Sequence, residues 1–112
     1  RTGLAIPYEI GCAQAFSRPT VSKNPLNGSY DMWFSYRSGS GEKYRIGYAK
    51  SNNKLDWVLS LNDSGIDVSS DGWDSEMIEY PFVLQHKEQR FMLYNGNGYG
   101  KTGFGIAVWE QQ

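Results

Sequence analysis

Short apolar runs, separated by Gly, Asn, Ser and Asp, recur along the whole chain. No window shows the 3.6-residue apolar period and the caps of an amphipathic helix, whereas alternating, aromatic-rich runs of this length are typical of β-strands. The runs predict strands at residues 18–23, 29–37 and 44–51, an outer strand around 57–59, and strands at 78–85, 89–95 and 103–110. The pattern therefore predicts an all-β fold.

The two groups of predicted strands are similar in sequence and lie about sixty residues apart. Pro19 corresponds to Pro81, Met32 to Met92, and "IGYA" at 46–49 to "FGIA" at 104–107. Each group ends in a strand, a Gly-rich turn and a further strand. Four antiparallel strands in a unit of this size are typical of a β-propeller blade. An ordinary β-sandwich with coincidental similarity is the alternative.

We accordingly predict a single domain over residues 1–112, with a partial propeller of about two four-stranded antiparallel blades. The first blade is expected at 11–66 and the second, incomplete blade at 67–112. The segment "GLAIPYEI" at 3–10 has strand-forming character but no place in the repeat. It is a candidate closing strand, which would supply a missing outer strand to its own chain or to a neighbouring one.

The stretch "NGNGYGKTGFG" at 95–105 raises the question of a phosphate-binding loop. Such a loop needs a glycine five residues before Gly100, and a helix after it. Asn95 occupies that position, and a strand-like run follows. Asn-Gly pairs favour tight turns because both residue types tolerate positive φ. The stretch is therefore predicted to connect two strands of a hairpin.

Composition and charge narrow the classes of partner. Aromatic residues make up 15% of the chain and there are 13 glycines, which favours sheet over helix. With 11 basic and 12 acidic residues, the chain lacks the basic excess of a nucleic-acid-binding face. No apolar run is long enough to span a membrane, so no membrane partner is expected. The spacing of Asp71, Asp74 and Glu76 does not match an EF-hand, and we predict no metal site and no cofactor.

Both units carry a polar or acidic residue, a proline, a hydrophobic strand, an aromatic-rich strand, a Gly-rich turn and a Gly-x-Ala strand. In this pattern the chain resembles the five-bladed propellers of the arabinanase, xylosidase, invertase and levansucrase superfamily, over most of residues 17–110. The resemblance implies that the innermost strand of each blade lines a central axis where sugar binds. It also implies a general acid in a Glu-x-Pro motif at the start of such a strand.

Glu79-Tyr80-Pro81 matches that motif residue for residue. Apolar residues flank Glu79 on both strand faces, in "MIEYPFVL", so we expect its carboxyl to be partly desolvated. Desolvation raises a carboxyl pKa toward the value that a general acid needs. The alternative is a solvated glutamate at a loop end, or one paired with an arginine.

The first unit departs from the family pattern. Hydrolysis of a glycosidic bond needs two carboxylates, yet Ser17 and Arg18 stand where the second unit has Glu79 and Tyr80. Glu9 and Glu76 are off the motif. A complete hydrolytic site is therefore missing from these residues, and the sequence leans against an enzyme for this chain alone.

Other residues near the strand starts are candidate ligand contacts. Arg18 is expected either to hydrogen-bond a sugar or anionic group, or to neutralise Glu79 or Glu76. Aromatic rings are expected to stack on sugar faces. Together with Glu79, the predicted substrate-binding residues are Arg18, Tyr80, Trp73, Tyr36 and Glu76.

Three functions remain open. The first is a carbohydrate-binding or glycosidase-like propeller fragment that recognises sugars at inner-strand starts. The second is a glycoside hydrolase with Glu79 as general acid once the ring is completed, and the third is a non-catalytic interaction or scaffold protein. Two open blade faces would leave apolar surface in water, so we expect a homo-oligomer, with excision from a longer propeller as the alternative.

Overall fold

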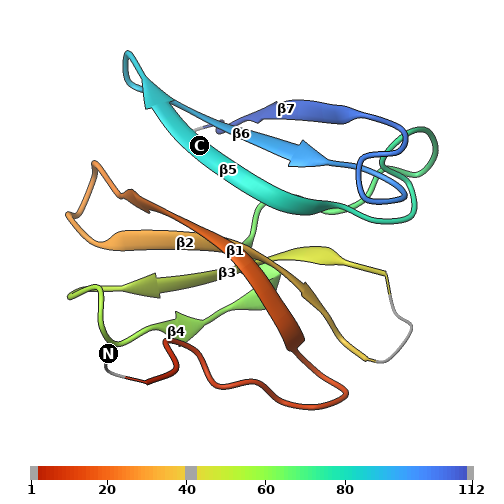
Figure 1. Ribbon diagram of the computed structural model, residues 1–112. Helices are drawn as coiled ribbons and strands as arrows, with labels where there is room; N and C mark the ends of the chain where they lie inside the picture. Colours follow the sequence, from red (N-terminus) through yellow and green to blue (C-terminus); the bar gives the residue numbers. More distant parts are fainter. Residues whose placement is uncertain (1–2, 40–42, 111–112) are drawn as a thin grey trace.

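The computed structural model describes residues 3–39 and 43–110, which form two antiparallel sheets (Figure 1). The four-stranded sheet has the order β1 (Gln14–Lys23), β2 (Tyr30–Arg37), β3 (Arg45–Ser51) and β4 (Val58–Leu59). The three-stranded sheet has the order β5 (Glu79–His86), β6 (Gln89–Asn95) and β7 (Phe104–Val108). Apart from the single-turn 3₁₀ helix η1 (Leu61–Asp63), the described residues contain no helix. The predicted all-β class is confirmed.

The two sheets share the same irregularity in their first strands. The pairing of β1 with β2 shifts between Ser17 and Thr20, and that of β5 with β6 shifts between Glu79 and Phe82. The residue before the proline has a positive φ in both strands, +49° at Arg18 and +55° at Tyr80. Residues other than glycine seldom adopt this conformation. The sequence repeat is therefore also a repeat of an uncommon backbone geometry.

An apolar core fills the space between the sheets. Its buried members come from both sheets and the segment that joins them: Trp33, Ile46, Ile78, Val83, Met92 and Tyr94. The indole N–H of Trp33 donates to the carbonyl of Ser64 at 3.0 Å, which satisfies its only polar group. Between the two sheets, the most extensive contact is that of β1 with β5, near the centre of the molecule (Figure 1).

A buried ion pair also joins the sheets. Arg90 on β6 lies 3.1 Å from the carboxylate of Asp31 on β2, and both side chains are almost completely buried. The same carboxylate accepts a short hydrogen bond from the Tyr48 hydroxyl, and the Arg90 guanidinium lies over the rings of Trp33 and Trp109. Each charge is therefore compensated within the interface.

Residues 3–10 form no strand beyond an isolated bridge between Glu9 and Ala13. The segment lies beside the four-stranded sheet, far from the free edge of β7 (Figure 1). Ile6 packs against an outer cluster that contains Met32, Phe34 and Ala49. The expected closing strand is thus not formed within this chain, because the segment covers the face of a sheet rather than pairing with an edge. No helix in the described ranges is long and apolar enough to cross a membrane.

Candidate functional site

The candidate site lies at the start of β5. Glu79 is the first residue of the strand and its side chain is completely buried. Within the described residues, neither carboxyl oxygen has a hydrogen-bond partner. Buried polar groups are nearly always paired, so an unpaired carboxyl in this position requires a reason. It is the feature on which the site is built.

Burial raises the pKa of the Glu79 carboxyl to about 7, and the positive charge of Arg18 opposes that rise. Near neutral pH the group is therefore divided between its charged and neutral forms. In the neutral form it carries a proton that it can donate in a hydrogen bond, while its other lone pairs still accept.

Arg18 and Tyr80 lie next to this carboxyl. The Arg18 guanidinium stands over the Tyr80 ring, 4.2 Å from its centroid. The backbone N–H of Tyr80 donates to the Ser35 hydroxyl at 2.6 Å, and Ser35 is itself completely buried. Ser35 pairs with Ser17 across the first sheet. The structure begins β1 at Gln14, four residues before the predicted start, so Arg18 lies in the middle of this strand. The fold thus brings the middle of β1 to the start of β5, and with them three of the predicted site residues.

Two more tyrosines lie near Tyr80. Burial raises the pKa of Tyr80, with further contributions from Glu79, Tyr44 and Tyr99. The rings of Tyr44 and Tyr99 meet edge to face with centroids 6.0 Å apart, and the Arg37 guanidinium lies 5.8 Å from the Tyr44 ring. Sequence reasoning missed these three residues, because each lies outside the strand-start motif.

Asn97, in the Gly-rich turn between β6 and β7, fixes the segment that leads into Glu79. Its side-chain oxygen accepts from the backbone N–H groups of Glu76 at 2.7 Å and Met77 at 3.1 Å. Its side-chain nitrogen donates to the carbonyl of Gly72 at 3.1 Å. The turn is the predicted hairpin connection, and it is also a clamp on the strand start. An asparagine between glycines was the only sequence signal of this second role.

Trp73 packs within the chain rather than beside Glu79. Its ring stacks on Tyr94, with centroids 5.4 Å apart and planes 28° apart. It also lies flat against the backbone, where a Cβ atom at Gly96 or Gly105 would come within 2.4–2.5 Å of the ring or the Trp73 carbonyl. The ring remains 36% exposed. Trp73 was expected to stack on a sugar, and its packing on Tyr94 and the two glycines was not predicted.

Tyr36 and Glu76 also lie apart from Glu79. Tyr36 points to the face of β2 opposite Ser35, where its ring meets Phe34 edge to face at 6.3 Å. It lines a cavity of about 460 Å³ together with Arg45 and Asp67. The side chain of Glu76 is exposed, and only its backbone groups take part in the clamp. The predicted site therefore divides into a cluster of Glu79, Arg18 and Tyr80 and three residues elsewhere.

Among the described residues, no second buried carboxylate joins the cluster. Ser17 occupies the position in β1 that corresponds to Glu79. The other buried acids are engaged, Asp31 by Arg90 and Asp74 by the Tyr94 hydroxyl at 3.0 Å. Among the residues described, no group of three His, Cys, Asp or Glu side chains is arranged to hold a metal ion.

Comparison with known proteins gives relatives but no family, since no family model matches the chain. Two proteins of Mycobacterium tuberculosis, both described as uncharacterized, are 55% identical to it over 96 residues: MT1551 of strain CDC 1551 / Oshkosh and Rv1502 of strain ATCC 25618 / H37Rv. The matched region is 86% of this chain and 30% of each relative. The chain thus spans less than a third of the length of the curated relatives that it matches.

Proposed function

We propose that the two sheets are successive blades of a propeller-like fold, and that the chain binds carbohydrate where the middle of β1 meets the start of β5. The observation that carries the proposal is the completely buried, unpaired carboxyl of Glu79, next to Arg18 and Tyr80. Further support comes from the irregularity shared by β1 and β5 and from the resemblance of both units to glycosidase propellers.

The chemistry of the cluster suits a sugar. Tyrosine rings offer flat apolar surfaces for the C–H faces of a pyranose or furanose. The Arg18 guanidinium offers several N–H donors in a fixed plane for hydroxyl oxygens. A neutral Glu79 carboxyl both donates and accepts, as a hydroxyl partner requires. The Glu79 side chain has no exposed surface, so a ligand hydroxyl reaches its carboxyl only after a local shift of the residues that cover it, and would then satisfy the group that the protein leaves unpaired.

The raised pKa of Glu79 favours one second candidate, a glycoside hydrolase with Glu79 as general acid. That reaction also needs a carboxylate on the other side of the scissile bond. In a propeller it would come from a further blade, because Ser17 holds the corresponding position in this chain. A scaffold without ligand chemistry is the third reading.

Binding to a glycan array, followed by titration calorimetry on the best ligand, tests the proposal. Arg18→Met and Tyr80→Ala should each weaken binding about tenfold, since each removes roughly 1–2 kcal/mol of contact with the sugar. Lys50→Met, at an exposed site on β3, is the matched control and should leave the affinity unchanged.

Glu79→Gln separates the binding module from the enzyme. A binding module should keep its affinity within a fewfold, because the amide also donates and accepts. An enzyme should lose turnover of an aryl glycoside by about two to four orders of magnitude, as removal of a general acid does. If the wild-type chain binds no glycan, the carbohydrate proposal is wrong and the scaffold reading replaces it.

A further inference from the structure

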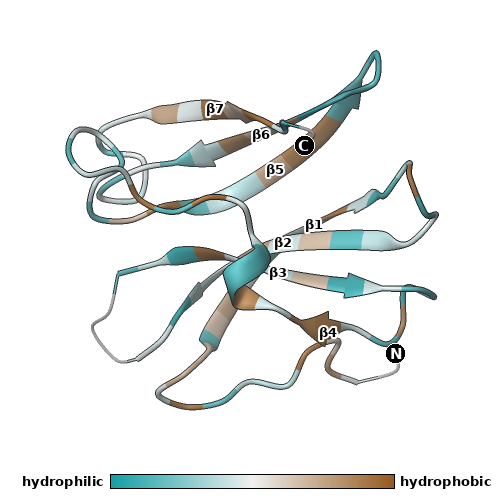
Figure 2. Cartoon of the chain, turned by 180° about the vertical axis from the view of Figure 1, so that it is seen from behind, coloured by the Kyte–Doolittle hydropathy of each residue, from teal (hydrophilic) through white to brown (hydrophobic). Residues whose placement is uncertain are grey.

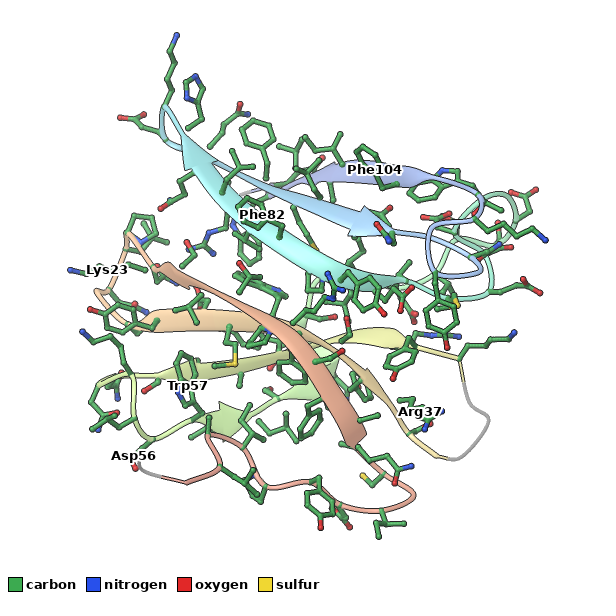
Figure 3. All side chains as sticks on the ribbon, in the orientation of Figure 1. Lys23, Arg37, Asp56, Trp57, Phe82 and Phe104 are labelled. Carbon is green, nitrogen blue, oxygen red and sulfur yellow. The ribbon has the colours of Figure 1, made fainter. Side chains whose placement is uncertain are left out.

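The outer face of the three-stranded sheet is mostly apolar, with polar residues only near its ends, at His86, Gln89 and Asn95. Strand pairing places seven apolar side chains on this face: Phe82, Leu84, Phe91, Leu93, Phe104, Ile106 and Val108. The exposed fraction is 73% for Phe104, 59% for Phe82 and 58% for Ile106. Figure 2 shows hydrophobic segments along β5 and β7, and Figure 3 labels Phe82 and Phe104 on this sheet. A contiguous apolar surface of this kind marks an interface, unlike scattered single residues.

The repeat identifies what kind of surface fits this face. In the first sheet, Thr20, Trp33 and Tyr48 form one row across β1, β2 and β3, on the face that packs against the second sheet. The corresponding row of the second sheet is Phe82, Leu93 and Ile106, which lies on the open face. We call the face that carries this row the front of each sheet and the opposite face its back. The front of the first sheet packs against the back of the second, and the corresponding front of the second sheet has nothing in the described chain against it.

The residues of the back face against which such a front packs can also be named. On the second sheet it consists of the row Val83, Met92 and Ala107, which packs toward Trp33. The first sheet has the same residue types in the corresponding row, Val21, Met32 and Ala49. A sheet with a Val-Met-Ala row on its back is thus the complementary surface.

We infer that a third antiparallel sheet, carried on the same and longer polypeptide, covers this face and presents a back of that kind. The source of the sheet is argued from length, because the mycobacterial relatives are 55% identical and more than three times as long as the matched region. A relative with so much additional chain has room for further sheets of the same size. The inference goes beyond sugar binding and does not depend on it.

Accessibility of Ile106 in the full-length product of the gene tests the inference. In a Cys12→Ser background, which removes the exposed native thiol, Ile106→Cys is compared with Asn52→Cys, at an exposed site next to the first sheet. Each maleimide-labelling rate is divided by the rate for the same variant in denaturant. We expect this ratio to be at least about tenfold lower for Ile106→Cys than for Asn52→Cys, because a covered cysteine reacts only when the structure opens locally.

Three results would overturn the inference. Equal ratios for the two cysteines in the full-length product would show that the face is open. Protection of Ile106→Cys in the full-length product that grows with protein concentration would identify a second copy as the occupant. A gene that encodes no residues beyond these would exclude a third sheet. If Ile106→Cys does not fold, Val108→Cys on the same face is read in the same way, and none of these readouts involves a glycan.

Discussion

At the scale of single residues, Glu79 shows what a sequence motif can and cannot predict. The Glu-x-Pro pattern and the apolar residues around it identified the position and the direction of its pKa shift. Complete burial without a hydrogen-bond partner was not predictable, because it depends on how β5 packs against β1 and β2 of the other sheet. The contact between the sheets at this point is the hydrogen bond from the Tyr80 backbone N–H to the Ser35 hydroxyl of β2, which supplies no donor to the carboxyl.

The raised pKa of Glu79 predicts a pH-dependent cost to folding. The folded pKa of about 7 lies above the ordinary carboxyl value of 4.5, so the folded chain binds the proton more tightly than the unfolded one. The free energy of unfolding should therefore fall as pH rises from about 4.5 to 7, by roughly 1–3 kcal/mol. Glu79→Gln should remove this fall in urea denaturation measured between pH 4 and pH 8.

The exposed residue Glu76 gives the control for this measurement. Glu76→Gln removes a carboxyl that is exposed rather than buried, and should leave the pH dependence of wild type intact. The prediction concerns the slope of stability against pH, so a difference in stability between Glu79→Gln and wild type at pH 4 alone does not contradict it. Stability curves that run parallel from pH 4 to pH 8 would contradict it.

At the scale of elements, the strand periods and Asn-Gly turns predicted six of the strands to within a few residues, and the short β4 as well. The bulges were not predictable, since arginine and tyrosine seldom adopt the positive φ that Arg18 and Tyr80 have here. The segment at 3–10 has strand-forming residues but no strand in this chain: Ile6 packs against a sheet face, whereas Leu4 and Ile10 are largely exposed. Gly96 and Gly105 appeared to be turn and strand glycines, whereas both also leave room for the Trp73 ring.

The clamp formed by Asn97 predicts a local effect of its removal. Asn97→Ala deletes hydrogen bonds to Glu76, Met77 and Gly72, and should lower the free energy of unfolding by about 2–3 kcal/mol. Hydrogen exchange at the amides of Glu76 and Met77 should become faster, since their acceptor is lost.

Two variants sharpen this test. Asn97→Asp keeps the acceptor for both amides and loses the donor to Gly72 and Ser75, so exchange at the two amides should stay slower than in Asn97→Ala. Asn52→Ala, at an exposed position, should change stability by less than about 0.5 kcal/mol. Unchanged exchange at Glu76 and Met77 in Asn97→Ala would show that the turn does not hold the strand start.

At the scale of the whole molecule, the two sheets are joined by apolar packing and by the buried pair of Asp31 and Arg90, which lie 59 residues apart. Strand patterns predict which residues share a face, but not which two faces meet. For this reason the sequence predicted two repeated units without predicting the ion pair between them.

This pair predicts a large loss of stability on truncation of one partner. Asp31→Ala leaves the Arg90 guanidinium buried without its counter-charge, and should cost about 3–5 kcal/mol. Thermal and urea unfolding measure the loss. Asp67→Ala is the matched control, because its pair with Arg45 at 3.4 Å is largely exposed and should contribute less than about 1 kcal/mol. Similar losses in the two variants would rule out a special role for the buried pair.

The front-to-back contact between the sheets has a consequence for how such a molecule can be completed. A contact between two different surfaces has no intrinsic stopping point, unlike a two-fold symmetric one. Each added unit restores the surface that it covers, so growth ends only when the last unit meets the first in a closed circle. Where the angle between neighbours prevents closure, the same contact propagates as an open fibre. The angle between two adjacent sheets thus decides between a discrete particle and a polymer.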